Sequence, residues 1–214
     1  VTTLENNSQM IPLGPVASHT AIKLLGTVGA GFFNANSAHP FENPSALSNL
    51  IEILSFILIP SASVYYYGVS LGNKNHARII FTVILSLLAI GICLSLYGEY
   101  LYSASLDAYP VMEGKETRFG LTSSVIWSTG TTATSSGSIN AMMSSLSPIS
   151  SGIALFNMLL GELIFGGVGT GLCTLILYIL LTVFLSGLMV GRTPEYFGKK
   201  IEVKEMQWII ISIF

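Results

Sequence analysis

Long apolar stretches separated by short polar segments dominate the chain. Residues 47–67 and 79–101 are each apolar over at least the roughly 20 residues that a helix needs to cross a bilayer. Residues 153–190 form a third apolar run, too long for one straight crossing and too short for two, with glycines near its middle. One helix broken by an intramembrane loop explains both its length and its glycines. The pattern predicts an all-α membrane protein.

Two shorter apolar segments, residues 19–25 and 119–129, each run into a stretch of small residues. The first stretch, 26–31, reads Gly-Thr-Val-Gly-Ala-Gly, and the second, 130–138, is rich in Gly, Ser and Thr. Small residues let backbone carbonyls turn toward a common axis. Rings of such carbonyls replace the water shell of potassium, and Thr-Val-Gly-x-Gly is typical of potassium channels. We therefore predict two re-entrant filter loops, which a membrane tolerates because protein surrounds them.

The order of segments repeats: pore helix, filter loop, polar exit and inner helix. We therefore predict two pore-loop repeats of the potassium channel and transporter superfamily, about half of the four that one pore needs. The first predicted division, 1–72, holds a filter at 26–31 and an inner helix at 47–72. The second, 73–190, holds an outer helix at 79–101, a pore helix at 119–129, a filter at 130–138 and a broken inner helix at 153–190. The third, 191–214, is a charged loop and the start of a further membrane helix.

Basic residues predict the orientation of the chain. Lys74 and Arg78 lie in one loop, and Arg192 lies in another that also carries several lysines. Because cytoplasmic loops are enriched in Lys and Arg, residues 73–78 and 191–206 are expected to be cytoplasmic. Both filter loops then fall on the outer side, provided that the broken helix crosses only once.

Composition agrees with a membrane protein. Of 214 residues, 51% are hydrophobic and 9% are charged, against about 25% charged residues in soluble domains. The net charge of −2 leaves no basic surface for nucleic acid. Cys93 and Cys173 both lie in apolar spans, where packing is their expected role. The three histidines are widely separated and give no metal-binding spacing, and no catalytic arrangement of side chains is visible.

Two carboxylates lie within the apolar runs, Glu52 and Glu162. Intramembrane acidic residues are functional candidates by default. For Glu162, a hydrogen bond to unwound backbone is an equal alternative to attraction of ions. Glu52 is near the outer end of its helix, and exposure to solvent is the alternative there.

Four longer segments carry a resemblance to a known family. Residues 31–44, 112–120, 161–172 and 191–201 are similar to motifs of the KdpA family, the potassium-binding and translocating subunits of Kdp-type potassium pumps. The resemblance implies four pore repeats in a longer chain, of which this sequence spans the second filter to just past the third repeat. It also implies that the filter carbonyls bind potassium. The filter residues are Thr27, Val28, Gly29, Ala30 and Gly31 in one loop, and Thr134, Ser135, Ser136, Gly137 and Ser138 in the other. Separately, the interrupted apolar run suggests a loop that gates ion passage, with close helix packing through small residues as the alternative; its glycines are Gly166, Gly167, Gly169 and Gly171.

The filters depart from the family pattern at two kinds of position. The family's second filter usually reads Thr-Asn-Gly-Gly-Gly, whereas Val28 and Ala30 stand here. The Cβ of Ala30 would make a positive φ costly at that position. The third filter usually carries Ser-Cys-Gly, whereas Ser136 replaces the cysteine. Carbonyl coordination tolerates a side-chain change better than a backbone change, so Ala30 matters more.

The resemblance also implies partners and a location. Potassium is the implied ion, and ATP is used by a KdpB-like ATPase subunit rather than bound by this chain. A KdpC-like subunit and a small membrane peptide would complete a complex in the bacterial inner membrane. This chain would then be a non-catalytic subunit of a P-type pump, and because it begins at Val1 and ends in an apolar run we expect a fragment.

Two alternatives stay open: a passive cation channel made by two copies with two-fold symmetry, and a non-functional remnant.

Overall fold

The computed structural model describes residue 10 and residues 14–106 and 111–213. Residues 1–9 and 11–13 of the predicted division 1–72 therefore lie outside the described residues. The described helices are α1 (Gly14–Leu25), α2 (Ala46–Ser70), α3 (Lys74–Ser105), α4 (Gly120–Ala133), α5 (Pro148–Leu159), α6 (Thr170–Val190) and α7 (Val203–Ile213), with short 3-10 turns at Asn36–Ala38 and Met143–Ser145 and a small antiparallel hairpin of β1 (Glu195–Tyr196) and β2 (Lys199–Lys200).

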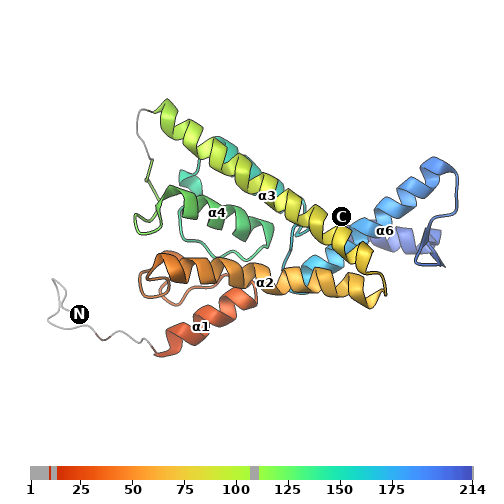
Figure 1. The fold of residues 1–214 in the computed structure, drawn as a ribbon, viewed down its shortest axis with the longest axis horizontal. Helices are drawn as coiled ribbons and strands as arrows, with labels where there is room; N and C mark the ends of the chain where they lie inside the picture. The colour runs from red at the N-terminus through yellow and green to blue at the C-terminus, as the bar shows by residue number, and fades with distance from the viewer. Residues whose placement is uncertain (1–9, 11–13, 107–110, 214) are drawn as a thin grey trace.

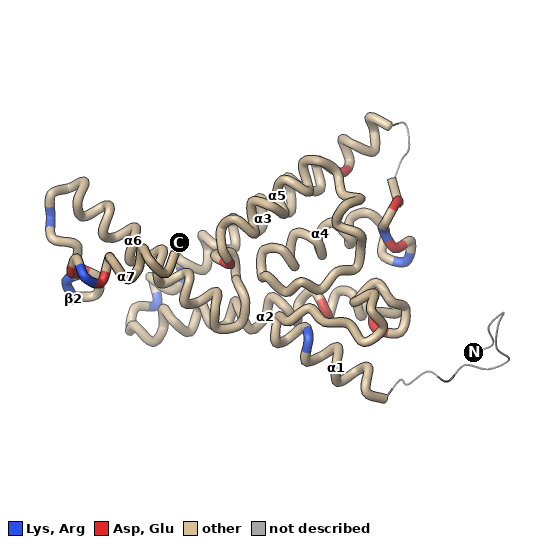
Figure 2. The backbone as a smooth tube through the Cα atoms, turned by 180° about the vertical axis from the view of Figure 1, so that it is seen from behind, with Lys and Arg blue, Asp and Glu red and all other residues tan. Residues whose placement is uncertain are grey.

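Three of these helices, α2, α3 and α6, are long and apolar enough to cross a membrane. They correspond to the two uninterrupted apolar runs and to the second half of the third. Large apolar side chains such as Leu58, Ile90 and Met189 are exposed along them, as expected where lipid is the solvent. Figure 2 shows long uncharged stretches in these helices and charges gathered mainly at helix ends and connections. The predicted all-α membrane fold is confirmed.

The helices form a wedge around α4. Helices α2 and α3 meet at a tight corner and diverge from it, and α4 packs between them, while α1 packs on α2 (Figure 1). At the corner, a Cβ added to Gly68 would overlap Ala77, so the glycine permits the close approach of the two helices.

Side-chain caps and hydroxyls move several helix ends from the predicted positions. Asn73 accepts hydrogen bonds from the amides of Asn75 and His76, so α3 begins at Lys74 and the predicted loop 73–78 is mostly its first turn. Helix α4 continues to Ala133, and the Thr134 hydroxyl donates to the Gly130 carbonyl after it. The predicted filter at 130–138 therefore begins as a loop only at Thr134. Helix α1 also begins earlier than predicted, at Gly14.

The third apolar run forms two helices and a loop. Ser147 caps α5 by accepting from the Ser150 amide, and Pro148 occupies the first turn, where its missing amide costs nothing. Helix α5 therefore begins five residues before the predicted position, 153. It ends at Leu159, and α6 begins at Thr170. Residues 160–169 between them form a loop, which we call the intramembrane loop.

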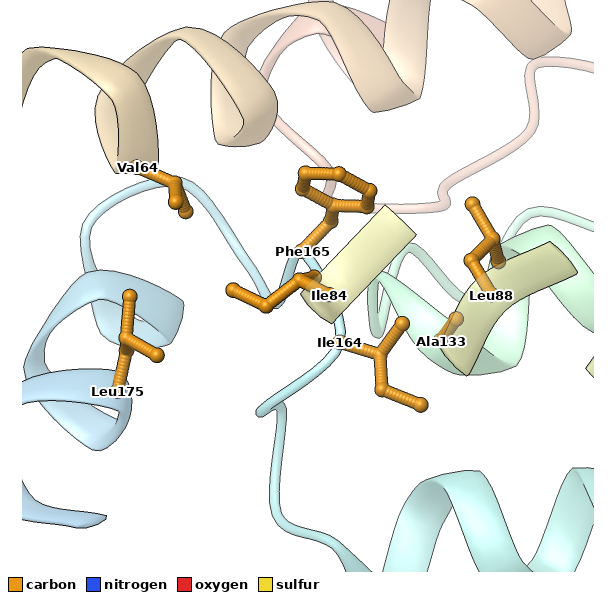
Figure 3. Close-up of a cluster of buried hydrophobic side chains, with 7 residues drawn as sticks. All are labelled: Val64, Ile84, Leu88, Ala133, Ile164, Phe165 and Leu175. Carbon is orange, nitrogen blue, oxygen red and sulfur yellow. The ribbon is translucent and has the colours of Figure 1, made fainter. Parts of the chain in front are cut away.

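The main hydrophobic core surrounds this loop. Ile164 and Phe165 of the intramembrane loop pack with side chains from α2, α3, α4 and α6 (Figure 3). A second cluster joins Leu24 of α1 and Trp127 of α4 to Phe56 of α2. Both short helices are thus fixed against the same membrane helix, and the segments that follow them are brought together.

Candidate functional site

The two predicted filter loops have the same backbone pattern. Thr27 and Ser135 both have φ of 51°, and two residues later Gly29 and Gly137 have φ of 75° and 70°. Thr27 and Gly29 have the same spacing along the chain as Ser135 and Gly137. Left-handed conformations are costly for residues with a Cβ, so their recurrence in register indicates two copies of one structural device. Ala30 is not among the residues with positive φ, and the strain considered for it from sequence does not arise.

Helices α1 and α4, the predicted pore helices, end with the same hydrogen bond. The Val28 amide donates to the Lys23 carbonyl at 2.9 Å, and the Ser136 amide donates to the Thr131 carbonyl at 3.0 Å. Each bond folds the chain that follows the helix back over the last turn of that helix. Among the described residues, no hydrogen bond reaches the carbonyl oxygens of residues 27–31 or 134–137. Backbone carbonyls without a protein partner are the ligands that potassium filters use.

The two loops are in direct contact. A Cβ added to Gly29 would overlap the Ser136 carbonyl and crowd the backbone of Gly137 and Ser138. On the other side, a Cβ added to Gly137 would meet only the Val28 carbonyl, at 4.0 Å. The structure thus brings the two sets of predicted filter residues to one place.

Buried polar side chains support the second loop from behind. The indole Nε1–H of Trp127 donates to the Ser138 carbonyl at 2.8 Å, and the Ser138 hydroxyl lies 3.3 Å from that of Ser37. The side-chain amides of Asn43 and Asn140 both donate to Asn49 Oδ1 at 3.0 Å. All six of these side chains are buried. They connect the second loop to the exit segment of the first.

Arg118 adds a further bridge between the two repeats. Its guanidinium donates to the backbone carbonyls of Asn43, at 2.6 Å, and of Ala38. Sequence reasoning assigned no role to Arg118 or to the buried asparagines. Arg118 and Asn43 lie in the segments 112–120 and 31–44, which carry the family resemblance, whereas Asn49 and Asn140 lie outside those segments.

A buried ion pair supports the first loop. Lys23 in α1 pairs with Glu42, and the other carboxylate oxygen of Glu42 accepts from the Phe33 amide at 2.9 Å. Burial alone would raise the pKa of Glu42, but the hydrogen bonds from Lys23 and Phe33 outweigh it and hold that pKa below its ordinary value. This pair was also missed from sequence, because the two residues are far apart along the chain.

A second buried pair lies in the other repeat. Lys115 and Glu99 approach to 3.3 Å with fully buried side chains. Glu99 also accepts from the Ser147 amide, and Lys115 donates to the Ser145 carbonyl at 3.1 Å. The pair therefore fixes the segment between the second filter loop and α5.

The two intramembrane carboxylates have different environments. Glu52 is buried, which rules out the solvent-exposed alternative, and its Oε2 has no hydrogen-bond partner among the described residues. Glu162 is partly exposed and has φ of 64°. It accepts a hydrogen bond from the Thr170 hydroxyl at the start of α6, so this partner is a side chain rather than the unwound backbone that was one of the two alternatives considered from sequence.

The intramembrane loop lies against the first filter loop. The Val168 amide donates to Thr27 Oγ1 at 3.0 Å, and a Cβ added to Gly167 would lie 3.6 Å from the same oxygen. Gly166 packs against the backbone of Gly171, which belongs to the first turn of α6 rather than to the loop. Of the predicted gate glycines, Gly166, Gly167 and Gly169 are therefore loop residues.

The second loop borders an open space instead. Ser135 and Gly137 are exposed and line a cavity of about 530 Å³ between α4 and α5. Within the described part of the chain, no group of three or more His, Cys, Asp or Glu side chains is placed to hold a metal ion. Backbone oxygen therefore provides the candidate ligands in these loops.

Comparison with known proteins identifies relatives along the whole chain. The family model described as "Potassium-transporting ATPase A subunit" matches residues 1–214. Proteins named potassium-transporting ATPase potassium-binding subunit are similar in Pseudomonas aeruginosa, at 52% identity over 99% of this chain, and in Leptospira interrogans, at 50% identity over 99%. In both comparisons the chain spans 38% of the length of the relative.

Proposed function

The chain belongs to the family of potassium-transporting ATPase A subunits, and we propose that its two filter loops bind and partly dehydrate potassium within a transport pore. The observation that carries the proposal is a pair of touching loops with the same backbone pattern and unpaired carbonyls. Carbonyl oxygens replace water around a potassium ion without a compensating charge.

In this proposal the side chains hold the loops and the backbone carbonyls meet the ion. The candidate ligands are the carbonyls of residues 27–31 and 134–138, although the Ser138 carbonyl accepts from Trp127 and is the least available. Trp127 and the Lys23–Glu42 pair would keep the loops from collapsing when no ion is bound. Preformed ligands lower the reorganisation cost of binding.

Two such loops make half of a four-part pore. We assign residues 1–72 and 73–190 to the second and third pore repeats of a longer subunit, and residues 191–214 to the connection toward the next. The remaining carbonyls would come from chain beyond these 214 residues. This fits the share of the relatives' length that the chain spans.

The proposed setting is a multi-pass protein of the bacterial inner membrane. The filter loops would face outward, and the basic segments 73–78 and 191–206 would face the cytoplasm. Energy would come from ATP hydrolysis by a KdpB-like partner, with a KdpC-like subunit and a small membrane peptide completing the complex. The relatives' name, which includes "ATPase", supports an ATPase partner.

Uptake of rubidium as a potassium substitute tests the proposal. The full-length subunit with these residues is expressed with its partner subunits in bacteria that lack other potassium uptake systems. Gly29→Asp places a side chain against the Ser136 backbone and is expected to abolish uptake. Gly72→Asp is the matched control, since Gly72 also has a positive φ but open space around it. Equal uptake by wild type and Gly29→Asp would contradict the proposal.

A further inference from the structure

Thr27 is the one described residue of the first filter loop whose side chain bonds to the intramembrane loop. Its hydroxyl accepts from the Val168 amide at 3.0 Å and donates to the Gly26 carbonyl at 2.8 Å. The side chain is largely buried, at 9% exposed. The hydroxyl thus both donates and accepts a hydrogen bond within the protein.

The conformation of Thr27 depends on these bonds. A β-branched residue with φ of 51° is strained, and two hydrogen bonds can offset that strain. Loss of the Val168 bond would therefore favour a different backbone conformation at Thr27. The filter conformation and the position of the intramembrane loop stabilise each other.

The intramembrane loop has its own strained residues. Glu162 and Phe165 also have positive φ, of 64° and 51°, and Phe165 is held by burial in the main core (Figure 3). Strain of this kind persists only where surrounding contacts enforce it. Core packing holds the loop from one side, and the Thr27 hydroxyl holds it from the filter side.

We propose that Thr27 is a positioning residue that couples the first filter loop to the intramembrane loop through its hydroxyl. The inference rests on the proposed function, since it gives the coupling a role in ion passage. An ion that orders the filter loop stabilises the conformation in which the hydroxyl meets Val168. Because coupling between two sites is reciprocal, potassium then holds the intramembrane loop in place, and displacement of that loop weakens potassium binding.

The second filter loop provides an internal comparison. Ser135 occupies the position equivalent to Thr27, with the same φ, yet its side chain is exposed toward the cavity. No hydrogen bond from the intramembrane loop reaches it among the residues that the structure describes. The coupling is therefore a property of the first loop.

Hydrogen exchange of the intramembrane loop tests the coupling directly, because the Val168 amide is itself the donor. Exchange is followed by mass spectrometry in the full-length subunit with its partners, with and without potassium. Thr27→Val and Thr27→Ala remove the hydroxyl, whereas Thr27→Ser keeps it. Thr82→Val is the matched control, since the Thr82 hydroxyl is exposed and bonds only within its own helix.

Without potassium, amide exchange of residues 160–169 is expected to be about fivefold faster in both hydroxyl-free variants than in the parent. This is the ratio of rates that corresponds to the net free energy of one typical hydrogen bond. Thr27→Ser and Thr82→Val should stay within about twofold of the parent, below the effect of one such bond. Potassium should slow exchange in the parent and in Thr27→Ser, but not in the hydroxyl-free variants. Equal exchange rates in Thr27→Val and Thr27→Ser would overturn the coupling.

The same data separate this inference from the proposed function. The measurement without potassium needs no ion binding, so faster exchange in Thr27→Val supports the contact whatever the ion does. Absence of any potassium effect in the parent, together with absent rubidium uptake, would overturn the proposed function. Potassium protection that survives in Thr27→Val would overturn the reciprocal coupling while leaving the proposed function standing.

Discussion

The two filter loops share a backbone but differ in what holds them. Both end a short helix with the same hydrogen bond and repeat the same positive φ values. The first loop is held by a buried ion pair and contacted at Thr27 by the intramembrane loop. The second is held by an indole and an asparagine network, and it borders a cavity. The requirement common to both is the direction of the carbonyls, and different side chains can meet it.

Alanine at the two equivalent glycines should give the largest contrast. Gly29→Ala adds a Cβ that overlaps the Ser136 carbonyl in a left-handed conformation, so we expect loss of potassium binding. Gly137→Ala meets only the Val28 carbonyl, at 4.0 Å, and carries mainly the conformational strain, about 1–2 kcal/mol. Potassium affinity of the two purified full-length variants measures the difference. Equal affinities would show that the loops do not pack as described.

Removal of the lysine beneath the first loop should have the next largest effect. Lys23→Met leaves Glu42 buried without its cation, which typically costs about 3–5 kcal/mol. The double variant Lys23→Met with Glu42→Gln removes the charge and should recover part of that loss. Denaturation in detergent measures the stabilities. A single variant as stable as the parent would mean that the pair does not support the loop.

The second loop should respond to loss of its indole. Trp127→Phe keeps most of the packing against Phe56 but leaves the Ser138 carbonyl without its donor. An unsatisfied buried group costs about 1–3 kcal/mol. Hydrogen exchange should quicken at residues 134–138 and stay unchanged at 26–31. Uniform change across both loops would argue against separate supports.

Acidification should have the smallest and most gradual effect, a loss of the stability that Glu42 gives to the first loop. The pKa of Glu42 is below its ordinary value of 4.5 in the folded chain. Its contribution to stability is therefore complete above pH 4.5 and lost as the pH falls through the lower folded pKa. Thermal unfolding should show the parent losing its advantage over Glu42→Gln in that acid range. A constant difference between the two proteins would contradict this sign.

Much of the fold follows from hydrophobic spacing. The apolar runs correctly predict the helices that can cross a membrane, because length and composition alone meet the bilayer's requirement. Helix ends were less predictable. Caps such as Asn73 and Ser147 extend the helices into polar segments, and the polar composition there conceals the helical turns.

The supports of the loops were the part that sequence could not provide. Lys23 meets Glu42, and Asn140 meets Asn49, only after distant segments fold together. Val168 bonds to Thr27 through a backbone amide, which leaves no trace in residue type. The small residues of the loops were visible from sequence because the tight backbone itself demands them, as at Gly29.

Location of a bound ion tests the central claim most directly. Thallium replaces potassium and scatters X-rays anomalously, so crystals of the full-length subunit with its partners can reveal its position. We predict thallium density beside the carbonyls of residues 27–31 and 134–137, lost in Gly29→Ala. Thallium density only elsewhere, with those carbonyls turned away from any ion, would contradict the account.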